Sequence, residues 1–271
     1  MKQPRKHLLC LLLALLLTGV LLAGCAADTA DATADLPVIT VGCDNYPPFT
    51  YVNSDGKPVG IDVELADEAF RRMGYRPEFV TINWAEKNSL LENGVIDCIW
   101  SSFSMSGRAD EYTWAGPYMY SHQVVAVMPD SDIQTLADLA GKTVVVQATT
   151  KPESLFLDGN DPRIPEIRAL HSLQKRELIY SYLSKGYADA VAAHETSILQ
   201  FMKDYGVEFR ILEEPLEAVE LGVAFSRSDD RGIAALPATL EEMHTDGTTR
   251  SILAGYLADP DKYLEADGYA D

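Results

Sequence analysis

The sequence predicts an α/β protein built as two lobes. Short β-rich segments alternate with helical segments along most of the chain, and this pattern is typical of parallel sheets with crossover helices. The alternation forms two separate strand–helix series with extended segments between them. A chain of 271 residues is long enough for two such lobes.

The first series begins at residue 38 with the β-rich run VITVGC. The helix that follows, IDVELADEAFRRMG, repeats apolar residues at helical spacing and is expected to end at Gly74. The expected elements, in chain order, are strand 38–43, helix 61–74, strand 77–82, helix 86–94 and strand 95–102.

A longer strand is expected at 120–128, and a second series follows it. Its expected elements are strand 142–147, a turn and helix from 152, the segment 166–170, helix 174–186, strand 188–193, helix 195–206 and strand 208–213. A strand at 220–226 and helices from about 229 to 257 complete the pattern. Pro237 is expected to kink the first of these helices or to start it afresh.

The N-terminus has the pattern of a secretory leader. A basic stretch, MKQPRK, precedes about fifteen nearly unbroken apolar residues, too few to span a bilayer, and small residues lead to Cys25. The motif LAGC resembles the bacterial lipobox, which implies cleavage before Cys25 and a lipid on its thiol. The alternative is an ordinary signal peptide that ends near a cysteine. We therefore expect a leader at 1–24 and a flexible tether at 25–36.

Composition excludes some functions. Lys2, Arg5 and Lys6 belong to the leader, so the mature chain has 19 basic and 41 acidic side chains, a net charge of −22. Such an acidic surface repels phosphate backbones and argues against nucleic-acid binding.

The cysteines suggest neither a disulfide framework nor a metal site. Cys43 and Cys98, which remain after the leader and the lipidated residue, are expected to be buried thiols. A disulfide between them is the alternative outside the cytosol. We expect no metal and no cofactor, because no C-x-x-C pair or His/Cys cluster is present.

Three polar loops follow strands of the two series: CDNYPPF, SSFSMSGR and QATTKPE. Ligands of parallel α/β sheets bind beyond the carboxyl ends of strands. SSFSMSGR ends in Arg108, whose guanidinium suits an anion. The alternative is a surface loop in which Arg108 pairs with Asp110 or Glu111. Three such loops together favour a binding site.

Long stretches of the chain resemble the bacterial family 3 extracellular solute-binding proteins, the amino-acid receptors of ABC importers. The stretches include VGCDNYPPFTYVNSDGKPVGIDVELADEAFRRMG, NWAEKNSLLENGVIDCIWSSFSMSGR and LADLAGKTVVVQATTKPES, and the likeness covers about residues 38 to 258. It implies a two-lobed periplasmic-binding-protein fold of type II with two hinge strands. Lobe one would be 37–123 plus 221–260, lobe two 128–218, and the hinge 124–127 and 219–221.

The resemblance also implies how the ligand is held. Arg108 matches the arginine that grips the ligand α-carboxylate, and Ser102 and Ser104 match positions that face the ligand amine. Thr149 and Thr150 match the lobe-two turn that offers N–H and hydroxyl groups to the carboxylate. Plain capping of the next helix is the alternative for these threonines.

Aromatic walls are implied at Tyr46 and Trp84, although either side chain could instead belong to the core. Asp44 follows the first strand and is expected near the ligand side chain. His194 stands where the family usually has an aspartate that binds the ligand ammonium, and Glu195 beside it is a second candidate.

A free histidine titrates near about 6.5, so we expect the charge of His194 to change within an ordinary pH range. If a ligand ammonium lies beside it, affinity falls between about pH 8 and about pH 5.5. If a second carboxylate or a neutral acceptor of the ligand lies there, affinity rises on acidification.

The expected function is that of a lipid-anchored extracytoplasmic receptor, a monomer, that delivers an amino acid to an ABC transporter permease. The alternatives are a receptor for another small carboxylate, a sensory receptor, and a dehydratase-like enzyme with Glu195 or His194 as acid or base.

Overall fold

The structure, a computed structural model, describes residues 35–228 and 233–266. Every element described below belongs to one compact unit that begins at Pro37. The expected leader, Cys25 and nearly all of the tether lie outside the described residues. Across 35–228 and 233–266, we find no helix that combines the length and apolar character needed to cross a membrane.

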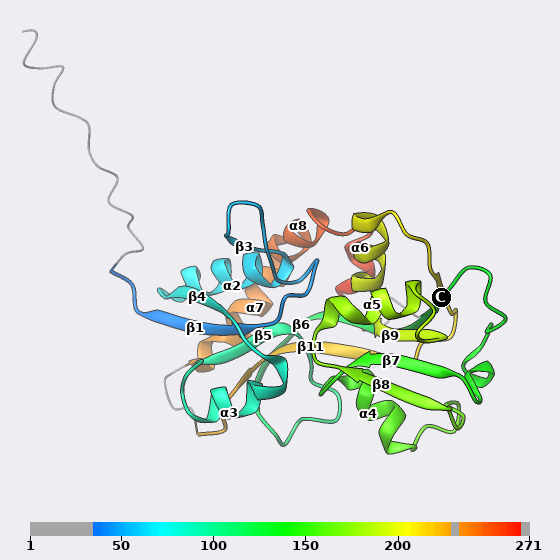
Figure 1. Ribbon diagram of the computed structural model, residues 1–271. Helices are drawn as coiled ribbons and strands as arrows, with labels where there is room; N and C mark the ends of the chain where they lie inside the picture. The colour runs from blue at the N-terminus through cyan, green and yellow to red at the C-terminus, as the bar shows by residue number, and fades with distance from the viewer. Residues whose placement is uncertain (1–34, 229–232, 267–271) are drawn as a thin grey trace, which may run out of the picture. The chain divides into compact units, whose positions relative to one another are not determined.

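Lobe one is built on parallel strands at the N-terminal end of the unit (Figure 1). The strand β1 (Val38–Cys43) lies between β4 (Arg76–Thr81) and β5 (Cys98–Ser104) and pairs in parallel with both. Its other elements are β2 (Tyr51–Val52), β3 (Pro58–Val59), α2 (Ile61–Arg72), η1 (Trp84–Glu86), α3 (Lys87–Glu92), η3 (Ile233–Ala235), α7 (Leu236–Thr245), α8 (Thr248–Ala254) and η4 (Asp261–Tyr263). The C-terminal helices therefore return to the lobe in which the unit begins.

Lobe two repeats this design in the middle of the chain. The strand β7 (Thr143–Gln147) pairs in parallel with β8 (Ala169–Leu173) and with β9 (Ala190–His194). Its other elements are η2 (Leu136–Leu139), α4 (Lys151–Asp158), α5 (Arg176–Ser184), α6 (Glu195–Tyr205) and the short β10 (Arg210–Ile211). Two of the helices end at a glycine in the left-handed conformation, Gly159 after α4 and Gly206 after α6, a common helix stop.

Two long strands join the lobes. The strands β6 (Thr113–Val127) and β11 (Glu217–Phe225) are antiparallel to each other. In lobe one β11 pairs with β5, and in lobe two the end of β6 pairs with β9, so one sheet of nine strands passes through both lobes. This is the predicted two-lobed fold. The hinge positions 124–127 and 219–221 lie on these strands, and their role as a hinge stays a prediction.

Side chains of the central strands alternate between the two faces of the sheet, because the strand repeat is two residues. In β5, Cys98 and Trp100 pack beneath α2 and α7, whereas Ile99 packs on the opposite face near α3. In β6, Val124 joins the cluster with α5 and α6, and Val125 joins the cluster near η2. Each lobe therefore has apolar contacts on both faces of its sheet, as buried parallel strands require.

The sequence pattern misplaced several strand boundaries, and two of the strands differ most from expectation. The strand expected at 120–128 begins at Thr113, although Gly116 and Pro117 within it are typical strand breakers. Pairing continues because the register of β11 shifts between Leu221 and Val223, opposite these residues. The strand expected at 208–213 is limited to Arg210–Ile211, which pair with β6, and the Leu212 N–H still donates to the Val125 carbonyl of β6 at 2.9 Å.

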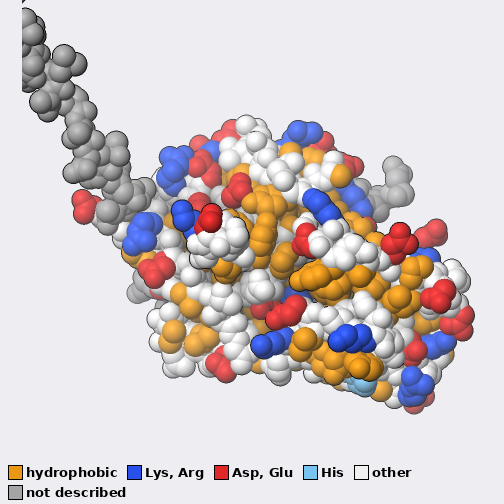
Figure 2. Space-filling model, turned by 45° about the horizontal axis from the view of Figure 1, so that its top comes forward, with side chains coloured by type: hydrophobic (Ala, Val, Ile, Leu, Met, Phe, Trp, Pro, Cys, Tyr) orange, Lys and Arg blue, Asp and Glu red, His pale blue; other side chains and the backbone are white. Residues whose placement is uncertain are grey.

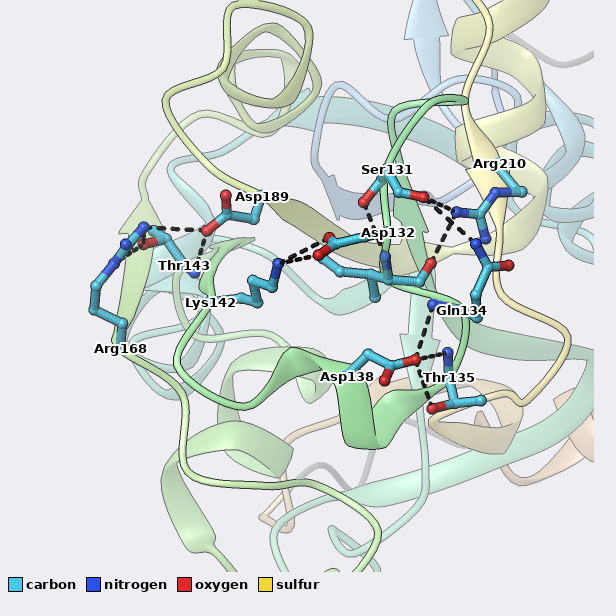
Figure 3. Close-up of polar contacts among 11 residues, drawn as sticks. Ser131, Asp132, Gln134, Thr135, Asp138, Lys142, Thr143, Arg168, Asp189 and Arg210 are labelled. Carbon is cyan, nitrogen blue, oxygen red and sulfur yellow. Dashed lines mark hydrogen bonds and ion pairs between the residues drawn. The ribbon is translucent and has the colours of Figure 1, made fainter.

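Polar contacts fix the outer end of lobe two (Figure 3). Thr135 and Asp138 form a capping box at the start of η2, with the Asp138 carboxylate accepting from the Thr135 N–H at 2.9 Å. Arg210 donates to the carbonyls of Ser131 and Ile133 at 2.9 and 2.8 Å. These bonds hold the loop between β6 and η2, far along the sheet from lobe one.

Gly60, which precedes α2, provides a test of the fold. Its φ is 128°, and an added Cβ would lie 2.2 Å from the Phe49 carbonyl oxygen. Gly56 also has a positive φ, 76°, but an added Cβ there meets nothing within 4 Å. We expect Gly60→Ala to lower the free energy of unfolding by more than about 2 kcal/mol, because backbone strain and overpacking add.

Denaturant unfolding of the mature chain measures this cost. The matched variant Gly56→Ala should cost only the backbone term, about 1 kcal/mol. Equal costs for the two variants would show that the contact between residue 60 and the Phe49 carbonyl does not matter.

Candidate functional site

A cavity of about 300 Å³ lies between the two lobes. Lobe one lines it with Trp84, Ser102, Phe103, Ser104 and Arg108, β6 contributes Gln123, and lobe two adds Thr149, Thr150, Lys151, Pro152, Arg176 and His194. The cavity thus brings together seven of the predicted ligand-binding residues: Trp84, Ser102, Ser104, Arg108, Thr149, Thr150 and His194.

Ser102 has a strained backbone that a buried carboxylate holds in place. Its φ is +48°, a left-handed conformation that costs a residue with a Cβ about 1–3 kcal/mol. The Ser102 N–H donates to Asp62 Oδ2 at 2.6 Å, and Tyr118 Oη donates to Asp62 Oδ1 at 2.9 Å. Asp62 sits in the first turn of α2 and is completely buried. This contact fixes the turn in the strand from which Ser102 lines the cavity.

Several buried polar atoms of the cavity lining have no hydrogen-bond partner among the described residues. They are Ser102 Oγ, Ser104 Oγ, Gln123 Oε1 and Trp84 Nε1. Buried polar atoms are nearly always paired, so a group of orphans around one cavity indicates a polar ligand. Three of the four can accept a hydrogen bond, and the indole can only donate.

Arg108 is held with its charge unpaired. Its Nη1 donates to the Ser104 carbonyl at 3.1 Å, and its Cζ lies 5.1 Å from the Phe103 ring centroid. Burial lowers its pKa, but a guanidinium keeps its proton in proteins. The alternative pairing with Asp110 or Glu111 does not occur, because no described carboxylate lies within ion-pair distance of Arg108.

The lobe-two turn before α4 is engaged by protein groups. Thr149, whose φ is +58°, donates its N–H to Glu153 Oε2 at 2.6 Å. Lys87 of lobe one donates to the Thr149 carbonyl and hydroxyl at 3.3 and 3.2 Å. Thr150 precedes α4, but its hydroxyl donates to the Gln147 carbonyl and does not cap the helix. The turn thus lines the cavity, while its Thr149 N–H is already committed to Glu153.

His194 lines the cavity as a neutral imidazole. Its Nδ1 lies 3.0 Å from Ser121 Oγ, and its Nε2 lies 2.8 Å from Gln123 Nε2, so Gln123 donates to Nε2 and Nδ1 donates to Ser121. Burial and the nearby Arg176 lower its pKa to about 3. The expectation that His194 changes charge between about pH 8 and about pH 5.5 is therefore wrong, because an unperturbed value does not apply to a buried ring.

Arg176 occupies the face of Tyr46. Its Cζ lies 3.3 Å from the Tyr46 ring centroid, and its Nε donates to Asp44 Oδ2 at 3.4 Å. Tyr46 is buried, its hydroxyl accepts from the His194 N–H at 3.3 Å, and its ring lines a second cavity of about 450 Å³. Trp84 alone of the two predicted walls lines the first cavity, where its ring packs edge-on against Phe103.

Asp44 and Glu195 lie outside the lining of the first cavity. Asp44 Oδ2 accepts from Gln147 Nε2 at 2.7 Å and from Arg176, which ties the end of β1 to lobe two. Glu195 begins α6 and accepts from Lys262 Nζ at 2.9 and 3.1 Å. Each carboxylate is therefore paired with a protein cation, Asp44 with Arg176 of the cavity lining and Glu195 with Lys262. Their contact with a ligand stays a prediction.

The sequence did not indicate Gln123, Arg176 or Asp62. Arg176 begins α5, and only two residues separate it from the end of β8, so the rule that ligands bind beyond the carboxyl ends of strands also points to this position. Gln123 lies within a strand, and Asp62 reads as a polar residue of an amphipathic helix. Their roles depend on contacts between distant segments and leave no local pattern.

The described cysteines, Cys43 and Cys98, are buried and are not joined by a disulfide. Burial and the neighbouring Asp62 raise the pKa of the Cys43 thiol to about 12. Over the same described residues, no group of three His, Cys, Asp or Glu side chains is arranged to hold a metal ion.

The chain matches the family model described as "Bacterial extracellular solute-binding proteins, family 3" over residues 39–259. Among curated proteins, the putative amino-acid ABC transporter-binding protein PatH of Vibrio harveyi is 31% identical over 84% of this chain and 90% of its own length. The glutamate-binding protein GluB of Corynebacterium glutamicum is 27% identical over 92% and 90%. The crystal structure of Tv2483 bound to L-arginine aligns with a TM-score of 0.75 and 26% identity over 82% and 91%.

The contact between Asp62 and Ser102 predicts a pH-dependent stability. Burial raises the pKa of Asp62 from 3.8 to about 7. An acid whose pKa is raised on folding stabilises the fold at pH values below its unfolded pKa, and this contribution is lost as pH rises through the folded pKa. Between pH 4 and pH 8, the free energy of unfolding of the wild type should therefore fall relative to that of Asp62→Asn.

Denaturant unfolding of both proteins across this range makes the measurement. The asparagine variant keeps an acceptor for the Ser102 N–H and has no proton to exchange, so it is the matched reference. A constant difference between the two proteins would mean that Asp62 is ionised in the fold at all these pH values.

Proposed function

Because the chain belongs to the bacterial extracellular solute-binding proteins of family 3, we propose that it is a receptor that binds an amino acid between its lobes and delivers it to an ABC importer. The observation that carries the proposal is the interlobe cavity, with a half-buried Arg108 that no described carboxylate pairs and four orphaned polar atoms in its lining. These groups require a small, polar, partly anionic ligand. The names of PatH and GluB support an amino acid and an ABC transporter.

In this proposal the ligand α-carboxylate binds Arg108, whose planar fork matches two carboxylate oxygens. The Trp84 indole and the turn at Thr149 and Thr150 border the same space. The ligand ammonium donates to acceptors from the orphaned set, Ser102 Oγ, Ser104 Oγ and Gln123 Oε1. This arrangement does not need an ionised group at His194.

In such a receptor, we expect the lobes to close on the ligand and the importer to recognise the closed form. Groups of both lobes meet across the cleft, as Asp44 does with Gln147 and Lys87 does with Thr149. Only β6 and β11 connect the strands of one lobe to those of the other within the described sheet. We place the hinge at 124–127 and 219–221, where small dihedral changes in two strands would open and close the cleft.

The contacts of His194 and Glu195 favour binding over catalysis. Both ring nitrogens of His194 are engaged by Ser121 and Gln123, and Glu195 is paired with Lys262 outside the cavity lining. A general acid or base must lie within hydrogen-bond reach of the reacting group. Neither residue offers a titrating group to a ligand in this cavity.

We expect Arg108→Ala to weaken ligand binding by about 30-fold or more, because loss of one partner of a buried charge pair costs about 2–5 kcal/mol. A thermal-shift screen of the common L-amino acids finds the ligand, and calorimetry measures the variant. The matched control is Arg168→Ala on the outer surface of lobe two, where Arg168 pairs with Asp189 (Figure 3). An affinity change below about threefold in a folded Arg108→Ala protein would refute the role of Arg108.

We also propose that the receptor is anchored outside the cytoplasm by a lipid on Cys25. The LAGC motif after a short apolar run supports this anchor. Intact-mass analysis of the protein from its native host should show a chain that begins at Cys25 and carries the added mass of a lipid. A mature chain with a different first residue, or with an unmodified Cys25, would contradict the anchor.

A further inference from the structure

Arg176 is a buried cation that stands at the boundary of two cavities. It lies in the first turn of α5, its side chain is 8% exposed, and it lines both the interlobe cavity and the second cavity beside α5 and α6. A buried charge is costly unless it is well paired. The pairing of Arg176 therefore bears on what the site binds.

Its protein contacts leave most of its donors unused. The only carboxylate within ion-pair distance among the described residues is Asp44, reached by Nε at 3.4 Å. The same Asp44 oxygen accepts a shorter bond, 2.7 Å, from Gln147. Nη1 and Nη2 of Arg176 make no hydrogen bond to a described residue. A planar fork with two unused nitrogens beside a cavity suits a carboxylate.

The charges around the two cavities differ. Three cations, Arg108, Lys151 and Arg176, line the interlobe cavity, and no carboxylate of the described residues does. Lys151 is already paired with Glu217 at 3.2 Å. Two guanidinium groups with unused donors remain: Arg108, which no described carboxylate pairs, and Arg176, which Asp44 contacts only through Nε. The second cavity instead contains Glu177 and Asp204 among aromatic side chains, and Figure 2 shows hydrophobic side chains over the part of lobe two where α5 and α6 lie. An anionic ligand therefore fits the interlobe cavity and not the second one.

The groups that would suit a cationic side chain are already occupied. The face of an aromatic ring attracts cations, and a carboxylate pairs with them. Here the Tyr46 face and the Asp44 carboxylate both contact the guanidinium of Arg176. A ligand with a cationic side chain would have to displace Arg176 from both.

We propose that Arg176 determines specificity by binding the side-chain carboxylate of an acidic amino acid and by excluding basic ones. This inference rests on the proposed function, since it assumes that the ligand α-carboxylate binds Arg108. The ligand then spans the two guanidinium groups of the cavity that have unused donors, one from each lobe. Its two carboxylates then accept hydrogen bonds from the unused donors of Arg108 and Arg176.

Calorimetry on the mature chain with L-glutamate, L-aspartate, L-glutamine and L-arginine tests the proposal. The wild type should bind L-glutamate or L-aspartate at least about 30-fold more tightly than L-glutamine, and L-arginine more weakly still. Arg176→Gln should lose this preference for the acid by a similar factor. The variant should also gain affinity for L-arginine, because Asp44 and the Tyr46 face become available.

The matched control is Lys175→Gln, which removes one positive charge from the exposed neighbouring position and should leave the preference unchanged. Arg176→Lys keeps the charge but not the fork, so it should retain only part of the preference for the acid. The melting temperature of each variant shows that it is folded. The wild-type preference tests the proposal even if Arg176→Gln does not fold.

Two results overturn the inference but leave the proposed function intact. One is a wild type that binds L-glutamine or L-arginine more tightly than either acid. The other is a folded Arg176→Gln with an unchanged ratio of affinities. A wild type that binds none of the four, and no other common amino acid in the thermal-shift screen, overturns the proposed function and the inference with it.

Discussion

The antiparallel pairing of β6 with β11 is the contact on which the rest of the structure depends. It makes one continuous sheet of the strands of both lobes, so the carboxyl ends of β5 and β9 lie on either side of one cavity. Arg108 reaches this space from the loop after β5, and His194 from the end of β9. The site belongs to neither lobe alone, and a ligand that binds both sides stabilises their contact.

The buried polar groups around the cavity are of two kinds: some have hydrogen-bond partners within the protein, and others have none. Asp62 holds Ser102 in a strained conformation, and Ser121 and Gln123 hold His194 as a neutral ring. Arg108 and the orphaned hydroxyls, by contrast, have hydrogen-bond capacity that the protein does not satisfy. Leaving buried donors and acceptors unpaired costs free energy, and a ligand of matching charge offsets this cost when it binds. Unpaired groups of this kind favour ligands that satisfy them over ligands that do not.

Sequence reasoning reached the parts of this account that depend on local pattern. The strand 38–43 and the helix that starts at Ile61 were predicted closely, because apolar periodicity and a glycine stop define them. Arg108 was singled out because it follows a buried strand, and it lines the cavity. Arg176 and Gln123 were missed, since their importance comes from contacts between lobes, and the charge of His194 was misjudged because its burial depends on the folded protein.

The most direct test of the central claim is a crystal structure of the mature chain grown with L-glutamate. The account predicts one L-glutamate molecule in the interlobe cavity, with its α-carboxylate within hydrogen-bond distance of Arg108 and its side-chain carboxylate on Arg176. L-Glutamate bound only in the second cavity beside Tyr205, or in the interlobe cavity without contact to either arginine, would contradict the account.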